Sequence, residues 1–311
     1  MGLTKNQLLL IRAVAEENLE KAKLYAIACC AEDTTQKNKQ EVTRYQRTLK
    51  SHALELMELP ANISMFATLE NLAENYNEKR YFLSESEKQL LEQISSMYAV
   101  SLKLMEKQIH YLNATLLYGK SGVGKTAFAK YVAYKLELPY LYVNLAQMLD
   151  SYLGGTAKNL TALFQFIQKQ KCVVMLDEID ALAVKRKYAD SGAAAEVSRS
   201  TTCLLQMLDQ TSNNHVILAA TNLEDSIDTA VKRRFTQKHE IKRLSHKDNY
   251  NLIHQIMTDT EIPFNMASAR KYADQDLTQS EIADHLSQRI AHMLIHQEKE
   301  VIFSRIKAVV V

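Results

Sequence analysis

The chain has 311 residues, of which 47% are hydrophobic and 24% charged, and its formal net charge at neutral pH is only +2. This length accommodates about two domains with packed cores. The nearly balanced charge argues against the basic surface that is typical of nucleic-acid binding. No apolar run approaches the length of a membrane span, and the run at residues 8–11 leads directly into Arg12, unlike a secretory signal.

The four cysteines are expected to be reduced thiols. Cys29 and Cys30 are adjacent and cannot bridge each other comfortably, and Cys172 lies in a predicted buried strand. Together with Cys203 they show no metal-ligand spacing. This cysteine usage predicts a cytoplasmic protein.

Residues 1–60 are predicted to form a hairpin of two helices. The first begins near residue 5, and its apolar or small residues are Leu9, Ala13, Leu19, Ala22, Ala26, Cys29 and Cys30. A polar turn at residues 32–35 precedes the second, whose apolar face comprises Val42, Tyr45, Leu49, Ala53 and Leu56. We expect this module to dock a substrate or an adaptor, and residues 61–83 to be a linker.

From residue 84 onward, strand and helix patterns alternate. A capping box at residues 84–87 opens a helix that is predicted to run to about Glu106. Strands are predicted at residues 114–118, 139–144, 172–176, 215–220 and 237–241. This order predicts an α/β domain at residues 84–244, with a five-stranded parallel sheet covered by helices on both faces. Only helical patterns follow, so residues 245–311 are predicted to form a helical subdomain.

The segment at residues 119–126, Gly-Lys-Ser-Gly-Val-Gly-Lys-Thr, has the spacing of a phosphate loop, or Walker A motif. It follows a strand pattern and opens a helix, so its backbone N–H groups and the helix N-terminus can hold phosphate oxygens. Lys125 can reach the β and γ phosphates, and the Thr126 hydroxyl can bind magnesium. The residues predicted to bind nucleotide are Gly119, Gly122, Val123, Gly124, Lys125 and Thr126.

The buried-type strand at residues 172–176 ends in Asp177 and Glu178, in the manner of a Walker B motif. Asp177 is predicted to hold Mg²⁺, and Glu178 to polarise the water that attacks the γ phosphate. The alternative interpretation is that the glycine turn and the acidic strand end occur by chance and have no function. The correct strand and helix context of both segments favours binding and hydrolysis of a nucleoside triphosphate.

Residues 216–222 form a strand pattern that ends in Thr221 and Asn222, and a short helix after Asp228 closes on Arg233 and Arg234. This layout resembles the second region of homology of the AAA proteins, within the wider AAA+ group, and the resemblance covers about residues 85–295. It implies ATP with Mg²⁺ as the cofactors, and a helical lid at residues 245–311. It also implies that Asn222 is the first sensor, which orients the attacking water.

By the same resemblance, Arg233 and Arg234 are arginine fingers that act on the nucleotide of the neighbouring subunit. A head-to-tail interface of this kind closes into a ring, and family members form hexamers, so a homo-hexamer is expected. The plain alternative is a solvated basic helix end that the helix dipole favours. The surrounding run of motifs favours the arginine fingers.

Tyr152, Leu153 and Gly154 follow the second predicted strand and resemble the first pore loop of the family. In this interpretation Tyr152 and Leu153 grip an extended polypeptide, and Gly154 permits the tight turn. The alternative is a core or interface tyrosine beside a plain turn. A second pore loop would fall at residues 185–199, although its basic run is equally consistent with a solvated face.

The helical tail departs from the family pattern. Residues 278–282, Thr-Gln-Ser-Glu-Ile, match the small-small-Asp-Ile motif only loosely. No convincing second-sensor arginine is present, because Arg289 lies too deep in its predicted helix. The contacts of the lid with the nucleotide are therefore not predicted.

The leading hypothesis is a ring-forming AAA ATPase that unfolds or remodels proteins by pulling them past Tyr152, as in single-ring bacterial unfoldases. Any degradation would need a separate protease chain. The alternative is an AAA+ nucleic-acid loader, or a helper ATPase in transposition or replication. A slowly hydrolysing nucleotide switch is a third hypothesis, which the intact Glu178 disfavours.

Overall fold

The computed structural model describes residues 2–16, 19–33, 42, 43, 45, 57–73, 76–150, 155–183, 192–211 and 215–304. The chain divides into two compact units, Met1–Glu58 and Leu59–Val311. In the part of the chain that the structure describes, no helix combines the length and the apolar character needed to cross a bilayer.

The first unit contains two packed helices, α1 (Lys5–Ala15) and α2 (Leu19–Glu32). The hydroxyl of Thr4 caps α1, and it also donates to the Glu32 carboxylate at 3.1 Å, so the start of α1 lies beside the end of α2. The prediction of one continuous first helix is therefore wrong. The predicted helix contains both α1 and α2, which together form the hairpin. Residues 46–56 of the predicted second helix lie outside the described residues.

The helical period of the sequence does not reveal this break. Each helix buries a small residue, whereas the larger Leu8, Ile11 and Val14 of α1 are exposed. Small side chains line the contact, since Ala13 and Ala22 are both buried. Apolar residues therefore recur at helical spacing on both sides of the turn, as they would in one continuous helix.

The second unit contains a six-stranded sheet in the order β1-β3-β4-β5-β2-β6. Its strands are β1 (Ala67–Glu70), β2 (Asn113–Tyr118), β3 (Tyr140–Asn144), β4 (Val173–Asp177), β5 (Val216–Thr221) and β6 (Gln237–Glu240). Strands β2 to β6 are parallel and confirm the five strands that the sequence predicts.

Strand β1 pairs antiparallel with β3 and extends the sheet by one strand at its edge. The sequence predicted only a linker here, at residues 61–83. Four residues, of which only Ala67 is buried, carry too short a pattern to indicate a strand, and pairing with β3 supplies the missing stabilisation.

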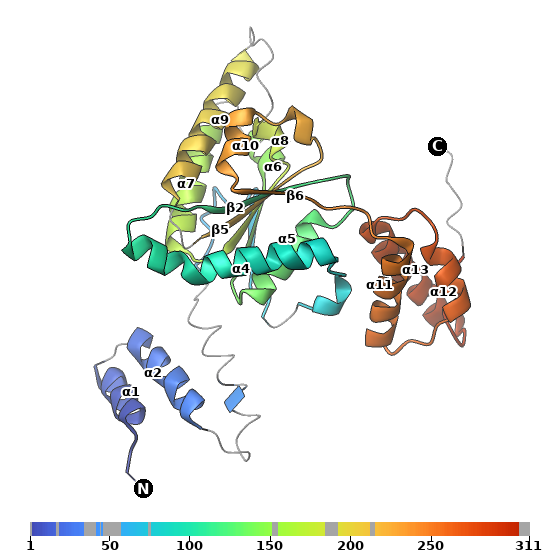
Figure 1. Cartoon of the computed structure of the whole chain (residues 1–311), viewed down its shortest axis with the longest axis horizontal. Helices are drawn as coiled ribbons and strands as arrows, with labels where there is room; N and C mark the ends of the chain where they lie inside the picture. Colours follow the sequence, from blue (N-terminus) through green and yellow to red (C-terminus); the bar gives the residue numbers. More distant parts are fainter. Residues whose placement is uncertain are drawn as a thin grey trace. The chain divides into compact units, whose positions relative to one another are not determined.

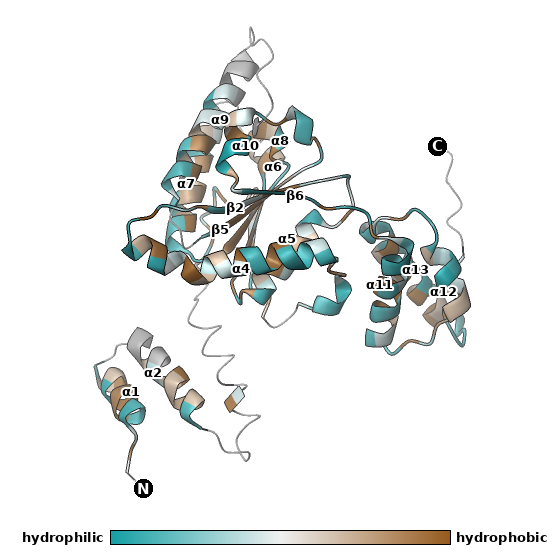
Figure 2. Cartoon of the chain, in the orientation of Figure 1, coloured by the Kyte–Doolittle hydropathy of each residue, from teal (hydrophilic) through white to brown (hydrophobic). Residues whose placement is uncertain are grey.

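Helices cover both faces of the sheet (Figure 1). Helices α4 (Glu85–Glu106) and α5 (Lys125–Lys135) lie on one side. The other side carries α6 (Leu145–Asp150), α7 (Thr156–Lys169), α8 (Asp180–Ala183), α9 (Gly192–Gln210) and α10 (Thr229–Arg234). The predicted capping box at Ser84 and Glu87 is present and begins α4. Figure 2 shows hydrophobic residues concentrated in the central strands. Strands β2, β4 and β5 are buried on both faces, as expected for the inner strands of a parallel sheet.

Three further helices form a compact bundle with its own hydrophobic core, which we call the lid. They are α11 (His246–Asp259), α12 (Met266–Ala273) and α13 (Gln279–His296). The core includes Leu252, Ile256, Tyr272, Ile282 and Phe303. The segment after α13 returns to this core, where Val301 pairs with Phe264.

His215, immediately before β5, makes the stability of the fold depend on pH. Its side chain is 1% exposed, and Nδ1 has no hydrogen-bond partner among the described residues. Burial, with a smaller effect of Lys171, lowers the pKa of His215 from 6.5 to about 4. Between these pH values the unfolded chain binds a proton that the folded chain does not, so the free energy of unfolding falls as the pH falls.

We expect His215 to account for a loss of about 3 kcal/mol as the pH is lowered from 6.5 to 4. Urea denaturation at several pH values, for the wild type and for His215→Leu, measures this contribution. The variant should show the shallower dependence on pH. Equal slopes for the two proteins would contradict the assignment.

Candidate nucleotide site

The candidate site lies at the carboxyl ends of the central strands. Strand β5 lies between β2 and β4, so the segments that follow these three strands meet at one edge of the sheet. The phosphate loop follows β2, Asp177 ends β4, and Asn222 follows β5. Ligands of open α/β sheets bind at this edge.

The phosphate loop has the backbone that a phosphate cradle needs. Gly119, Gly122 and Gly124 have φ angles of 143°, 75° and 109°, a range that favours glycine. At Gly119 an added Cβ would lie 2.3 Å from the carbonyl oxygen of Ile241, so no other residue fits there. Helix α5 begins directly afterwards, and its N-terminus adds a positive dipole end and N–H donors.

Lys125 is held at the centre of this edge by three oxygen acceptors. Its Nζ atom donates to the carbonyl oxygens of Gly119 and Lys120 at 2.8 and 2.9 Å, and to Oδ1 of Asn222 at 2.8 Å. Burial lowers the pKa of Lys125, and the nearby Asp177 and Asp180 partly oppose this shift. An ammonium group has three N–H donors, so contact with a phosphate requires Lys125 to exchange one of these acceptors.

Thr126 and Asp177 come together as a pair of oxygen ligands. The Thr126 hydroxyl donates to Oδ2 of Asp177 at 3.1 Å, although the two residues are 51 positions apart. Hydroxyl and carboxylate oxygens are the ligands that Mg²⁺ prefers, and the ion is commonly bound by one or two protein groups together with phosphates. The donor set of the two residues therefore fits Mg²⁺ beside the phosphate loop.

Glu178 follows Asp177 in a left-handed conformation with a φ angle of 55°. Its backbone N–H donates to Oδ1 of Asp177 at 2.9 Å, and its side chain is exposed. Such a φ angle is uncommon for a residue other than glycine and frequently accompanies a functional constraint. The turn directs the backbone away from the strand immediately after the predicted metal ligand.

Thr221 and Asp180 connect β5 to the end of β4, and we did not predict them as site residues. The Thr221 hydroxyl donates to Oδ1 of Asp180 at 2.7 Å and accepts from the backbone N–H of Leu223 at 2.9 Å. This pair fixes the turn that presents Asn222 to Lys125. The sequence signal was that Thr221 lies in the strand pattern at residues 216–222 and Asp180 lies two residues after Glu178.

Arg233 and Arg234 lie in α10 and differ in their surroundings. Arg234 forms a bidentate ion pair with Asp209 of α9, with Nε and Nη2 each 3.0 Å from a carboxylate oxygen. Arg233 is exposed, and its side chain has no hydrogen bond or ion pair with any described residue. Among the described contacts, neither arginine is joined to the phosphate loop of its own chain.

The predicted pore-loop residues Tyr152, Leu153 and Gly154 lie outside the described residues, as do residues 185–191 of the possible second loop. The structure resumes at Gly155, and α7 begins at Thr156. The position of the pore loop therefore stays a prediction from the sequence.

Arg289 is bound within the lid itself. Its Nε atom donates to the carbonyl oxygen of Ile302 at 2.9 Å, and Nη2 lies 3.7 Å from the Glu298 carboxylate. The lid instead meets the phosphate loop through the start of α13, where the backbone N–H of Ser280 donates to the Gly122 carbonyl at 3.2 Å.

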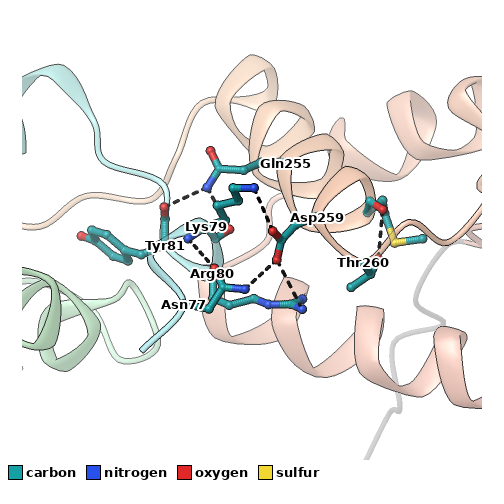
Figure 3. A network of polar contacts seen from close by, with 8 residues as sticks. Asn77, Lys79, Arg80, Tyr81, Gln255, Asp259 and Thr260 are labelled. Carbon is teal, nitrogen blue, oxygen red and sulfur yellow. Dashed lines mark hydrogen bonds and ion pairs between the residues drawn. The ribbon is translucent and has the colours of Figure 1, made fainter. Parts of the chain in front are cut away.

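A polar network also joins the lid to the segment before α4 (Figure 3). Asp259, the last residue of α11, accepts from Nδ2 of Asn77 at 2.6 Å and pairs with Lys79 at 3.0 Å. The hydrogen bond from Asn77 has the largest effect in lowering the pKa of the Asp259 carboxyl group, and the hydrogen bond from Lys79 adds to it. Nε2 of Gln255 donates to the carbonyl oxygens of Lys79 and Tyr81 at 2.8 and 3.2 Å.

Tyr81 extends this network to the phosphate loop. Its buried hydroxyl donates to Glu87 at 2.6 Å, and its ring packs against Tyr131 of α5 with the centroids 5.6 Å apart. A Cβ added to Gly124 would lie 3.3 Å from the same ring. The lid is thus connected to the loop on two sides, through α13 and through the segment that holds Tyr81.

Comparison with known proteins agrees with this geometry. Residues 115–243 match the model of the ATPase family associated with various cellular activities, abbreviated AAA. An uncharacterized AAA family ATPase of Sinorhizobium fredii is 34% identical over 169 residues, which cover 54% of this chain and 51% of the relative.

Two further relatives are named as proteasomal proteins. A proteasome-activating nucleotidase of Methanococcus maripaludis is 37% identical over 131 residues, which are 40% of this chain and 32% of the relative. A 26S proteasome regulatory subunit 6B homolog of Aspergillus niger is 34% identical over 143 residues, or 44% and 34% of the two chains.

The matches thus span from about a third to about half the length of these curated relatives. The match to the family model includes the phosphate loop, the end of β4, the end of β5 and α10, all of which fall within residues 115–243. Over residues 115–243 the chain is therefore similar to the AAA family of ATPases.

Proposed function

We propose that the chain hydrolyses ATP within a homo-hexameric ring and uses the energy to pull a polypeptide through the central pore. The observation that carries the ATPase part is the meeting of Lys125, Thr126, Asp177 and Asn222 at one edge of the sheet. These side chains come from three separate segments, and each has a chemical role that the hydrolysis of a phosphoanhydride requires.

In this proposal the phosphate loop and Lys125 hold the phosphate chain. Thr126 and Asp177 hold Mg²⁺, which neutralises charge on the β and γ phosphates when it is bound. Asn222 orients a water, and Glu178 accepts a proton from that water as its oxygen bonds to the γ phosphorus. The bond from the γ phosphorus to the bridging oxygen breaks, and ADP leaves with that electron pair.

The arginines complete the site of the neighbouring subunit. Arg233 is exposed and uncommitted among the described residues, which suits a group that must reach a nucleotide on another chain. The ion pair with Asp209 restricts the direction of Arg234. A planar guanidinium can spread charge over the transferring phosphoryl group, and its placement in trans makes assembly a condition of activity.

The polypeptide substrate is inferred from the relatives and from the sequence after β3. The relatives include a proteasome-activating nucleotidase and a 26S proteasome regulatory subunit homolog. Tyr152, Leu153 and Gly154 are proposed to grip the chain, because a tyrosine contacts many sequences through one amphipathic ring. An adaptor or a protease would be a separate chain.

The test of this proposal is steady-state ATP turnover with and without an unfolded protein or single-stranded DNA. Unfolded protein is expected to stimulate wild-type turnover, and Tyr152→Ala is expected to abolish the stimulation while basal turnover stays intact. Tyr98→Ala, which alters a partly buried tyrosine of α4 outside the candidate site, serves as the matched control. Stimulation by DNA alone, indifferent to Tyr152, would replace the proposal with the nucleic-acid loader.

A further inference from the structure

The start of α13 is packed directly onto the phosphate loop. Thr278 caps the helix in a capping box with Glu281, and a Cβ added to Gly122 would lie 3.0 Å from the Thr278 hydroxyl. With the hydrogen bond from Ser280 to Gly122, this contact directs the N-terminus of an 18-residue helix at the loop. The positive ends of α5 and α13 therefore converge on the same few residues.

Gln279, the first residue of α13, carries a side-chain amide that the protein does not satisfy. The residue is 8% exposed, and its Nε2 atom is buried without a hydrogen-bond acceptor among the described residues. A buried donor without a partner is costly and requires an explanation. None of the described polar contacts of the lid supplies one.

The place of this amide in the fold identifies a partner. A Cβ added to Gly124 would lie 3.4 Å from both Cδ and Nε2 of Gln279, so the amide lies against the last glycine of the phosphate cradle. An amide nitrogen only donates, so its partner must be an acceptor. The acceptors that a phosphate loop gathers are phosphate oxygens.

We infer that Gln279 binds the nucleotide through its side-chain amide, which donates a hydrogen bond from Nε2 to a phosphate oxygen held by the loop. The inference rests on the proposed ATP binding and adds a residue from the lid to that site. Arg289 is bound to Ile302 and Glu298 and does not take this role. Gln279 thereby links the orientation of the lid to the presence of the phosphate chain.

Calorimetric titration of the full-length chain with ATP, ADP and pyrophosphate tests this inference. Gln279→Met keeps the side-chain volume and removes the donor, and we expect it to weaken all three affinities about tenfold. Gln279→Glu places a carboxylate against the phosphates and should weaken them further. Gln288→Ala, an exposed glutamine in the same helix, serves as the control and should bind as the wild type does.

The outcomes distinguish a failure of the Gln279 contact from a failure of ATP binding itself. Unchanged affinities in a folded Gln279→Met protein would overturn the role of Gln279 while leaving ATP binding intact. A loss for ADP and ATP without a loss for pyrophosphate would overturn the phosphate contact and place the amide on the nucleoside. Absence of ATP and ADP binding by the wild type would instead refute the proposed function itself.

Discussion

Glu178→Gln is expected to lower ATP turnover by about 10²- to 10⁴-fold while nucleotide affinity stays unchanged. The substitution keeps the size of the side chain and removes the carboxylate that accepts a proton from the attacking water. Glu178 lies one residue beyond the predicted metal ligand Asp177, and no described contact joins it to the phosphate loop. Turnover and ADP affinity, measured on the same preparation, separate catalysis from binding.

Glu137→Gln is the matched control for this experiment. Glu137 is another exposed glutamate with a left-handed backbone, at a φ angle of 54°, but it follows α5, far in sequence from β4. The substitution should leave turnover unchanged, because both variants carry the same chemical change and only one lies at the site. A Glu178→Gln protein with turnover within a few-fold of the wild type would disprove the role of Glu178 as general base.

Arg233→Ala is expected to reduce turnover on the order of 10³- to 10⁵-fold, the range found for arginine fingers. The exposed guanidinium makes no described contact with its own site, so the loss must arise on the neighbouring subunit. Lys232→Ala in the same helix alters a lysine that pairs with Glu224 of its own chain, and it should have little effect on turnover.

Mixing variants tests whether Arg233 acts in trans. Lys125→Ala subunits cannot hold nucleotide but still present Arg233, whereas Arg233→Ala subunits hold nucleotide and lack the finger. Each protein alone should be inactive. In a random equimolar ring about a quarter of the interfaces would combine an intact nucleotide site with an intact finger, so activity should reappear. Mixed rings that stay inactive would show that Arg233 does not complete a neighbouring site.

Local chemistry explains why the sequence predicts the phosphate loop, the five parallel strands and the helix that begins at Glu85. A phosphate cradle needs glycine at particular positions of one short segment, and a buried strand needs a short apolar run. Such signals are complete within a few neighbouring residues. The break between α1 and α2 and the edge strand β1 lack a signal of this kind, because packing and pairing with distant residues stabilise them.

By itself, the sequence determined the nucleotide-binding class of this protein and the residue types at its site. Only the tertiary structure decided which of these residues meet. The bond between Lys125 and Asn222 joins residues 97 positions apart, and the Asn77–Asp259 contact joins residues 182 positions apart. The contact between Gln279 and Gly124 likewise joins residues that are far apart in the sequence. Contacts over such distances depend on the strand order and on how the lid packs, which no local pattern encodes.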